Sequence, residues 1–195
     1  MFMLWALPAG LILGTLAGGT IDQLTAVRFR WAPLAIAALL VQVVLFTPLG
    51  DQVAGGYGPA VYVISTAAVF VAVARNLRLL GMPIVGLGAL CNLVAIAANG
   101  GAMPADAAAL ASAGLDGPGA HTNSVVLAAP ALRSLTDIYA VPAWVPLANV
   151  FSVGDVLIGI GIVVVIVAAM RRGSQVRGAN DSGAKDPGAR ESAAP

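Results

Sequence analysis

Two aspartates in the carboxyl-terminal half of the chain are the residues best suited to chemistry. Asp155 lies within a long apolar run, and Asp137 lies eighteen residues before it in a proline-rich segment. Two carboxyl groups in a site of low dielectric constant cannot both ionise easily, so they share a proton. One can then deprotonate an attacking water while the other protonates a carbonyl oxygen or a leaving amine. We therefore predict that Asp137 and Asp155 are the catalytic residues of an aspartic hydrolase.

Asp155 is unusual because of its apolar surroundings. If the last helix begins near Asn149, a rise of about 1.5 Å per residue places Asp155 roughly 9 Å into it. A charged side chain at membrane depth costs about 2.5–3.5 kcal/mol, so it needs a partner. Two structural alternatives remain open. In the first, Asp155 is a protonated residue that bonds to another helix. In the second, Asp137 is a solvated loop residue paired with Arg133.

Polar residues near the two aspartates are candidates for substrate binding. Ser152 lies one turn before Asp155 on the same helical face, and Asn149 precedes it. Asn92 and Asn99 are seven residues apart, near one face of the preceding helix, where they could bond to the carboxylates or to a substrate backbone. Asn99 also fits a helix stop, since two glycines follow it.

His121 is the one histidine of the sequence and completes the substrate-binding candidates. We predict no metal site, because a metal usually needs three or four ligands. The sequence contains no phosphate loop or dinucleotide fingerprint, so we also predict no cofactor. Gln42 is a lone amide in an apolar run, which indicates a hydrogen bond between helices.

The composition is that of a membrane protein. Of the 195 residues, 59% are hydrophobic and 10% are charged, whereas soluble domains average roughly 25% charged residues. The ten basic and nine acidic residues nearly balance and form no basic patch, which argues against a nucleic-acid partner. A single cysteine, Cys91, excludes an intramolecular disulfide framework.

Five apolar runs are long enough to cross a bilayer as helices, which takes about 17–25 residues. They predict an all-α bundle of five transmembrane helices within residues 1–172, in which Gly154, Gly159 and Gly161 allow close helix packing. The first run lacks a preceding basic segment, so we interpret it as a retained helix and not as a secretory signal. The third is the shortest. The runs are Phe2–Gly18, Trp31–Thr47, Pro59–Ala74, Leu79–Ala98 and Ala148–Met170.

The arginines predict the orientation of the bundle. Short cytoplasmic loops are enriched in Lys and Arg. The alternate connections contain only Arg133, so we expect the amino terminus outside and the carboxyl terminus in the cytoplasm of a bacterial cell. The arginines on the predicted inner side are Arg28, Arg30, Arg75, Arg78, Arg171, Arg172 and Arg177.

Two segments lie outside the predicted helices. Residues 99–147 contain apolar and aromatic residues punctuated by prolines, and they are too long for a passive connection. We predict an ordered cap on the outer membrane surface, with a short helix over Met103–Gly114. Residues 173–195 are small, polar or charged, which predicts a disordered cytoplasmic tail.

The run Phe151–Gly161 resembles the last-helix motif of lipoprotein signal peptidases, the aspartic membrane peptidases of bacteria. The resemblance implies that Asp155 is catalytic and that Asp137 is the second catalytic aspartate, in the outer segment before that helix. Ser152 stands where that family has Asn, and Val94 and Ala95 stand where it has Asp-Arg. The Asn-x-Gly-Ala-Ala-Phe box of its first outer segment is absent here.

Most of the chain resembles an uncharacterised family of small bacterial membrane proteins, domain of unknown function 5317. The resemblance is carried by Asn99–Pro104, a histidine such as His121, Leu132–Asp137 and Asn149–Asp155. It implies that the cap and the start of the last helix form one unit.

Three functions are compatible with these features. The first is a hydrolase whose substrate is a membrane-anchored peptide or a lipid-linked molecule that enters from the outer leaflet. The second is a non-catalytic scaffold or subunit that binds another membrane protein. The third is a small proton- or cation-coupled transporter, in which the aspartates line the ion path.

Overall fold

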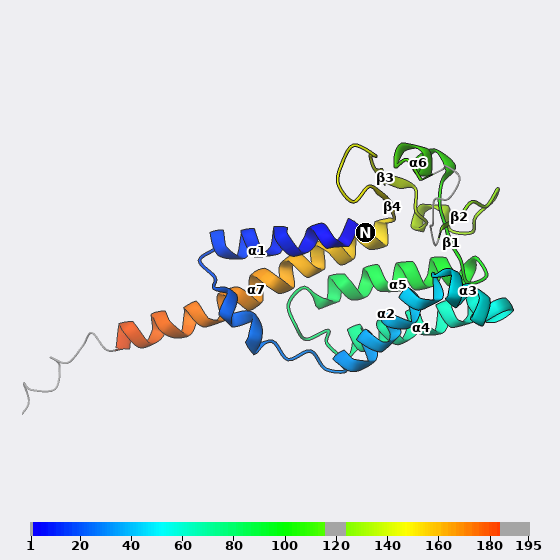
Figure 1. Cartoon of the computed structure of the whole chain (residues 1–195). Coiled ribbons are helices and arrows are strands. Elements are labelled where there is room, and N and C mark those ends of the chain that lie inside the picture. The colour runs from blue at the N-terminus through cyan, green and yellow to red at the C-terminus, as the bar shows by residue number, and fades with distance from the viewer. Residues whose placement is uncertain (1, 116–123, 184–195) are drawn as a thin grey trace, which may run out of the picture.

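The computed structural model describes residues 2–115 and 124–183, and within them the chain is mostly helical. Long helices run up and down one axis, and a smaller cap lies at one end (Figure 1). These helices are α1 (Ala6–Leu16), α2 (Ala32–Leu45), α4 (Gly58–Ala74), α5 (Met82–Ala98) and α7 (Val153–Gly183). Shorter helical elements are η1 (Phe2–Trp5), η2 (Ile21–Ala26), α3 (Pro48–Ala54) and η3 (Gly55–Tyr57).

Helix α7 packs between α1 and α5, and α2 packs against α4. Glycines set the close contact of α5 with α7. A Cβ atom on Gly88 would meet the backbone of Gly154, and one on Gly81 would meet the backbone of Gly161. The predicted close packing is therefore confirmed for Gly154 and Gly161, and Gly159 is also buried.

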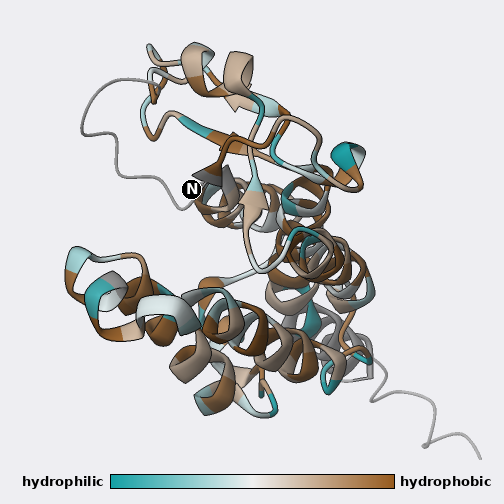
Figure 2. Ribbon diagram, turned by 90° about the vertical axis from the view of Figure 1, so that its right-hand side faces the viewer, coloured by the Kyte–Doolittle hydropathy of each residue, from teal (hydrophilic) through white to brown (hydrophobic). Residues whose placement is uncertain are grey.

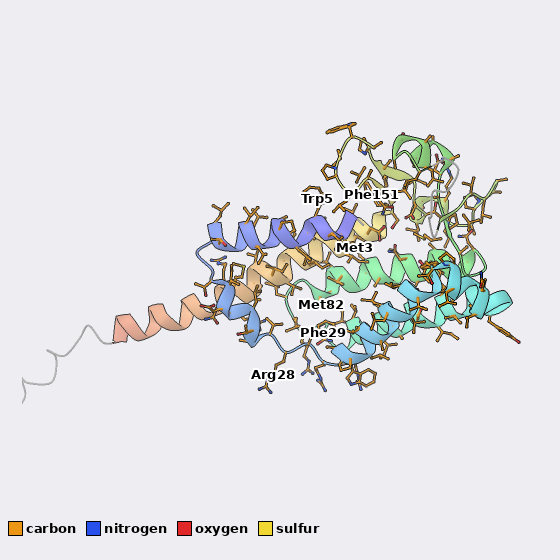
Figure 3. The ribbon with its side chains drawn as sticks, in the orientation of Figure 1. Met3, Trp5, Arg28, Phe29, Met82 and Phe151 are labelled. Carbon is orange, nitrogen blue, oxygen red and sulfur yellow. The ribbon has the colours of Figure 1, made fainter. Side chains whose placement is uncertain are left out.

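The end of the bundle opposite the cap contains the arginine-rich connections. The backbone N–H of Arg30 donates to Asn76 Oδ1 at 2.8 Å, and Asn76 Nδ2 donates to the Arg30 carbonyl at 2.7 Å. The guanidinium of Arg75 lies over the Trp31 ring, 4.6 Å from its centroid. Figure 3 places Arg28 and Phe29 on this end, which we call the basic end.

The cap comprises residues 99–115 and 124–152, and it is where the all-α prediction is wrong. Two small sheets form there, because irregular backbone without helix must still pair its N–H and C=O groups. Strands β1 (Met103–Pro104) and β2 (Ser124–Val125) are parallel, and β3 (Tyr139–Val141) and β4 (Asn149–Phe151) are antiparallel. The short 3-10 helix η4 (Arg133–Leu135) precedes β3.

The predicted cap helix is shorter than expected. Helix α6 covers Ala107–Ser112, because Met103 and Pro104 pair as a strand. Asp106 is its N-cap, and its side chain accepts hydrogen bonds from the backbone of Ala108 and Ala109. Gly114, at a φ of +68°, follows the end of the helix as predicted.

Within residues 2–115 and 124–183, two helices are long and apolar enough to cross a membrane. Pro48–Ala74 is a continuous helical stretch of 27 residues that contains an 18-residue window with a mean hydropathy of 1.7. Val153–Arg172 has 20 residues and contains such a window with a mean hydropathy of 2.7. The third predicted run, the shortest in sequence, is thus lengthened because α3 and η3 lead directly into α4. Shorter apolar helices cover Met3–Leu16, Ala32–Leu45 and Met82–Ala98. Figure 2 shows how strongly hydrophobic residues dominate the bundle helices.

The predicted carboxyl-terminal tail begins as helix. Helix α7 continues through residues 173–183, and residues 184–195 of that tail lie outside the described residues. His121, a predicted substrate-binding residue, also lies outside them.

Candidate functional site

Asp155 lies in the first turn of α7, not two turns into a helix. The predicted depth of roughly 9 Å is therefore wrong, since Asn149–Phe151 pair with β3 as a strand and the helix begins only at Val153. A carboxylate in this position is favoured by the partial positive charge of the helix amino terminus.

A reciprocal capping box explains where α7 begins. The Asp155 backbone N–H donates to Ser152 Oγ at 3.1 Å, and the Ser152 backbone N–H donates to Asp155 Oδ2 at 3.1 Å. A Ser followed three residues later by an acidic residue, before an apolar run, is a sequence signal for such a helix start. Applied to Ser152-x-x-Asp155, this signal gives the start of the helix that hydropathy alone misplaces.

Asn92 of α5 connects the capping box to a second helix. Its Nδ2 donates to Asp155 Oδ1 at 2.8 Å, and its Oδ1 accepts from Ser152 Oγ at 3.0 Å. Both oxygens of Asp155 are thus hydrogen-bonded, and Ser152 is fully buried. The ring of bonds holds the Asp155 carboxylate in one orientation at the boundary between bundle and cap.

Asp137 reaches the same region from the cap. Its backbone N–H donates to the Pro104 carbonyl at 3.0 Å, and its carbonyl accepts from the Asp106 N–H at 2.9 Å, so the backbone is tied to β1. The residue is 8% exposed, and its Oδ1 is the one buried side-chain oxygen or nitrogen in the described parts of the chain that lacks a hydrogen-bond partner.

Burial, and secondarily the negative charge of Asp155, raise the pKa of Asp137 to about 7. The alternative in which Asp137 pairs with Arg133 is wrong. The Arg133 guanidinium instead donates to Asp106 Oδ2 at 2.8 Å, because Asp106 is the more accessible carboxylate at the start of α6.

The two aspartates line one cleft of about 440 Å³, which lies mostly among the bundle helices and is bounded by the cap at Met103, Asp137, Asn149 and Val150. Its volume lies within the range of small-molecule sites, about 300–1,000 Å³. Met3, labelled in Figure 3 beside the start of α7, closes one side of it. The cleft contains polar side chains at Gln42, Thr66, Asn92, Asp137, Asn149 and Asp155.

Asn99 does not join this site. Its Nδ2 donates to the Ala95 and Ala131 carbonyls, and its Oδ1 accepts from the Ala131 N–H at 2.8 Å. Asn99 is the residue that ends α5, so the helix-stop alternative describes it, with an added role in holding the cap.

Thr66 is a site residue that sequence reasoning missed. Gln42 Nε2 donates to Thr66 Oγ1 at 3.2 Å, which confirms the predicted bond of Gln42 to another helix. The bond places both side chains in the cleft. Thr66 shares the α4 face with Tyr62 and Val69, at spacings of four and three residues, and this periodicity was the available signal.

The described residues contain no group of three or more His, Cys, Asp or Glu that could hold a metal ion. The site therefore offers carboxyl, amide and hydroxyl groups as its chemistry. Their arrangement suits proton transfer and hydrogen bonding to a bound molecule.

Comparison with curated proteins and with solved structures gives no match in either set. The model of the Family of unknown function (DUF5317) matches residues 26–167. The match extends from the connection before α2 well into α7, and it contains Asn92, Asp137, Ser152 and Asp155. This chain therefore belongs to the Family of unknown function (DUF5317).

Proposed function

We propose that this protein is a membrane-embedded aspartic hydrolase. The observation that carries the proposal is that Asp137 and Asp155 line one cleft, and that Asp137 is buried there with an unpartnered carboxyl oxygen. A buried polar atom without a partner is costly in a folded protein. Such an atom is expected where a substrate or an attacking water supplies the missing bond.

The apolar surface of the bundle supports the membrane location. Each of α1, α2, α4 and α5 exposes large apolar side chains, for example Ile12 at 59%, Val43 at 65%, Ile64 at 68% and Leu87 at 53%. Water-soluble proteins rarely expose apolar surface on so many neighbouring elements. A bilayer would cover these faces, with all five long helices crossing it.

The distribution of charge supports one orientation. The arginine-rich connections gather at the basic end, and the cap with Asp137, next to the start of α7 with Asp155, lies at the other. Because cytoplasmic loops are enriched in Arg and Lys, the basic end faces the cytoplasm of a bacterial cell. The cap and the cleft then open towards the outer leaflet.

The different surroundings of the two aspartates assign their roles. Asp155 is the carboxylate, because it accepts hydrogen bonds from Asn92 and from the Ser152 backbone at a helix amino terminus. Asp137 is the proton donor at neutral pH, because burial and the Asp155 charge raise its pKa.

In the proposed reaction, Asp155 takes a proton from water as the water oxygen bonds to the carbonyl carbon of the substrate. Asp137 gives its proton to the carbonyl oxygen, so a neutral tetrahedral intermediate forms. The bond from carbon to the leaving nitrogen then breaks, and the nitrogen receives the proton held by Asp155. Asp137 recovers its proton as the new carboxyl group forms. The substrate is a membrane-anchored peptide or a lipid-linked molecule.

The test compares membrane lipoproteins and peptides by mass spectrometry in cells with the wild-type protein and with variants. Asp137→Asn should abolish turnover. Asp155→Glu should lower it strongly while preserving the fold, since Ser-x-x-Glu is the usual capping box and only the carboxyl position changes. Asp22→Asn, at an exposed aspartate of η2, is the matched control and should leave processing intact.

Full turnover in Asp137→Asn, at wild-type protein abundance, would refute the proposal. Two further outcomes also count against it. Loss of a co-purifying membrane protein in the variants would favour a scaffold, and pH-dependent ion flux in proteoliposomes would favour a transporter.

A further inference from the structure

The polarity of the cleft changes along its length. On α4, cleft-lining residues recur on one face, with Thr66 nearer the cap and then Val69 and Val73 towards the basic end. Spacings of three and four residues keep these side chains on one stripe of a helix. This wall of the cleft is therefore polar near the cap and apolar towards the basic end.

The opposite wall repeats the same order. On α7, Asp155 is followed by Ile158 and Ile162, and on α5 Asn92 is preceded by Val85 about two turns deeper. The seven residues from Asp155 to Ile162 span about 10 Å of helix. The cleft lining is thus apolar over about that length, from the carboxylates towards the basic end, and we call this part of the cleft the apolar channel.

The polar end offers a bound molecule donors, from the protonated Asp137 carboxyl and the Asn149 side-chain amide, and it also offers acceptor oxygens. Asp137 Oδ1 is unpartnered, and the described residues make no hydrogen bond to Gln42 Oε1, whose Nε2 is bonded to Thr66. The Asn92 side chain is already hydrogen-bonded to Asp155 and Ser152. The negative charge of Asp155 also disfavours an anion there.

We propose that the cleft binds a single-chain N-acyl amide, with its amide at the two aspartates and its aliphatic chain between Val69, Val85 and Ile162. The proposal rests on the proposed hydrolase function and names its substrate class. Hydrolysis adds OH from water to the acyl carbon and H to the nitrogen, which releases a fatty acid and an amine. No other co-reactant is needed.

An amide fits better than the corresponding ester because its N–H supplies a donor. A ligand without a donor would bury the acceptor oxygens unsatisfied, which is the costly case. A phospholipid fits less well, because its phosphate would approach the negative charge of Asp155 and its second chain has no place in a cleft of about 440 Å³.

Binding is measured on the purified full-length protein in a neutral detergent, by native mass spectrometry and by ligand-induced thermal stabilisation. The probe is N-dodecanoyl ethanolamine. The matched ligands are its ester analogue 2-hydroxyethyl dodecanoate, the anion dodecanoate, and the short-chain N-hexanoyl ethanolamine. We expect the amide to bind on the order of ten-fold tighter than the ester, and tighter still than dodecanoate or the hexanoyl amide.

Two variants of α4 test where the aliphatic chain of the ligand binds. Val69→Phe fills the apolar part of the cleft and should weaken binding of the dodecanoyl amide by about ten-fold. Val71→Phe adds the same bulk at a residue that is 43% exposed and absent from the cleft lining, and it should bind as the wild type does. Thermal midpoints without ligand check that both variants fold.

Equal binding of dodecanoate and the amide, or equal binding by the two α4 variants, would overturn the inference. Comparing the dodecanoyl and hexanoyl amides on the wild type tests the apolar channel without any substitution, and equal affinities would overturn it as well. If these results occur while Asp137→Asn still abolishes turnover of membrane peptides, the hydrolase stands and only the substrate class is wrong.

Discussion

At the scale of single residues, the site depends on two aspartates with opposite surroundings. Asp155 has partners for both oxygens, whereas Asp137 has an orphaned oxygen and is 8% exposed. The capping box alone accounts for Asp155 as a structural residue. It does not account for Asp137, whose buried Oδ1 forms no hydrogen bond in the described structure. Asp137 is therefore stronger support for a catalytic role than the motif that surrounds Asp155.

The raised pKa of Asp137 predicts a pH dependence of stability. With a folded pKa of about 7 against an ordinary value of 3.8, the folded state binds more protons than the unfolded state between these limits. Stability should therefore fall as pH rises from about 4 to 7, by at most about 4 kcal/mol. Thermal unfolding of the purified protein at a series of pH values measures this slope. Asp137→Asn should flatten it.

Catalysis should follow the same titration. The proposed mechanism needs the protonated carboxyl of Asp137, so turnover is lost as pH rises through its pKa of about 7. The rate of substrate cleavage by the purified protein, measured across this range, reports the loss. A wild-type stability profile that is flat between pH 4 and 7 would contradict the raised pKa of Asp137, whatever the variant does.

At the scale of elements, the contact of α5 with α7 positions Asn92 against Asp155. Gly88→Ala should separate these helices, because the new Cβ would lie within 3 Å of the backbone of Ile158. We expect a loss of about 1–3 kcal/mol, typical of overpacking, together with reduced turnover. Gly56→Ala is the control, since nothing lies within 4 Å of its Cβ position. If Gly88→Ala and Gly56→Ala have the same thermal midpoint, α5 and α7 can shift to accommodate the added methyl group, which contradicts the prediction.

The elements also show what the sequence can predict. Hydropathy locates the bundle helices because each must be apolar over its length, and the glycines within them indicate the close approach at Gly154 and Gly161. Hydropathy misplaces the start of α7, because Asn149–Phe151 are apolar enough to continue a helix and become a strand only through pairing with β3. Such a pairing depends on contacts distant in sequence, which a local pattern does not contain.

The site was predictable to a similar degree. Residue chemistry and spacing select Asp137, Asp155, Asn92 and Ser152, which the structure places at the junction of bundle and cap. Spacing alone misassigns Asn99, because it shares the helical face of Asn92 but lies where the chain turns into the cap. The periodicity of α4 places Thr66 on one face with Tyr62 and Val69, but its bond to Gln42 is seen only once α4 packs against α2.

At the scale of the whole molecule, the separation of the cap from the basic end predicts one orientation in the membrane. Single cysteines in a Cys91→Ala background report it. Trp144, 84% exposed in the cap, and Leu77, 45% exposed between α4 and α5, are suitable positions for substitution by Cys. In intact spheroplasts, an impermeant maleimide should label Trp144→Cys and leave Leu77→Cys unlabelled until the membrane is opened, because arginine-rich loops stay in the cytoplasm. The reverse labelling would place the aspartates on the cytoplasmic side. A substrate could then reach the cleft only from the inner leaflet, and an outward-facing hydrolase would be excluded.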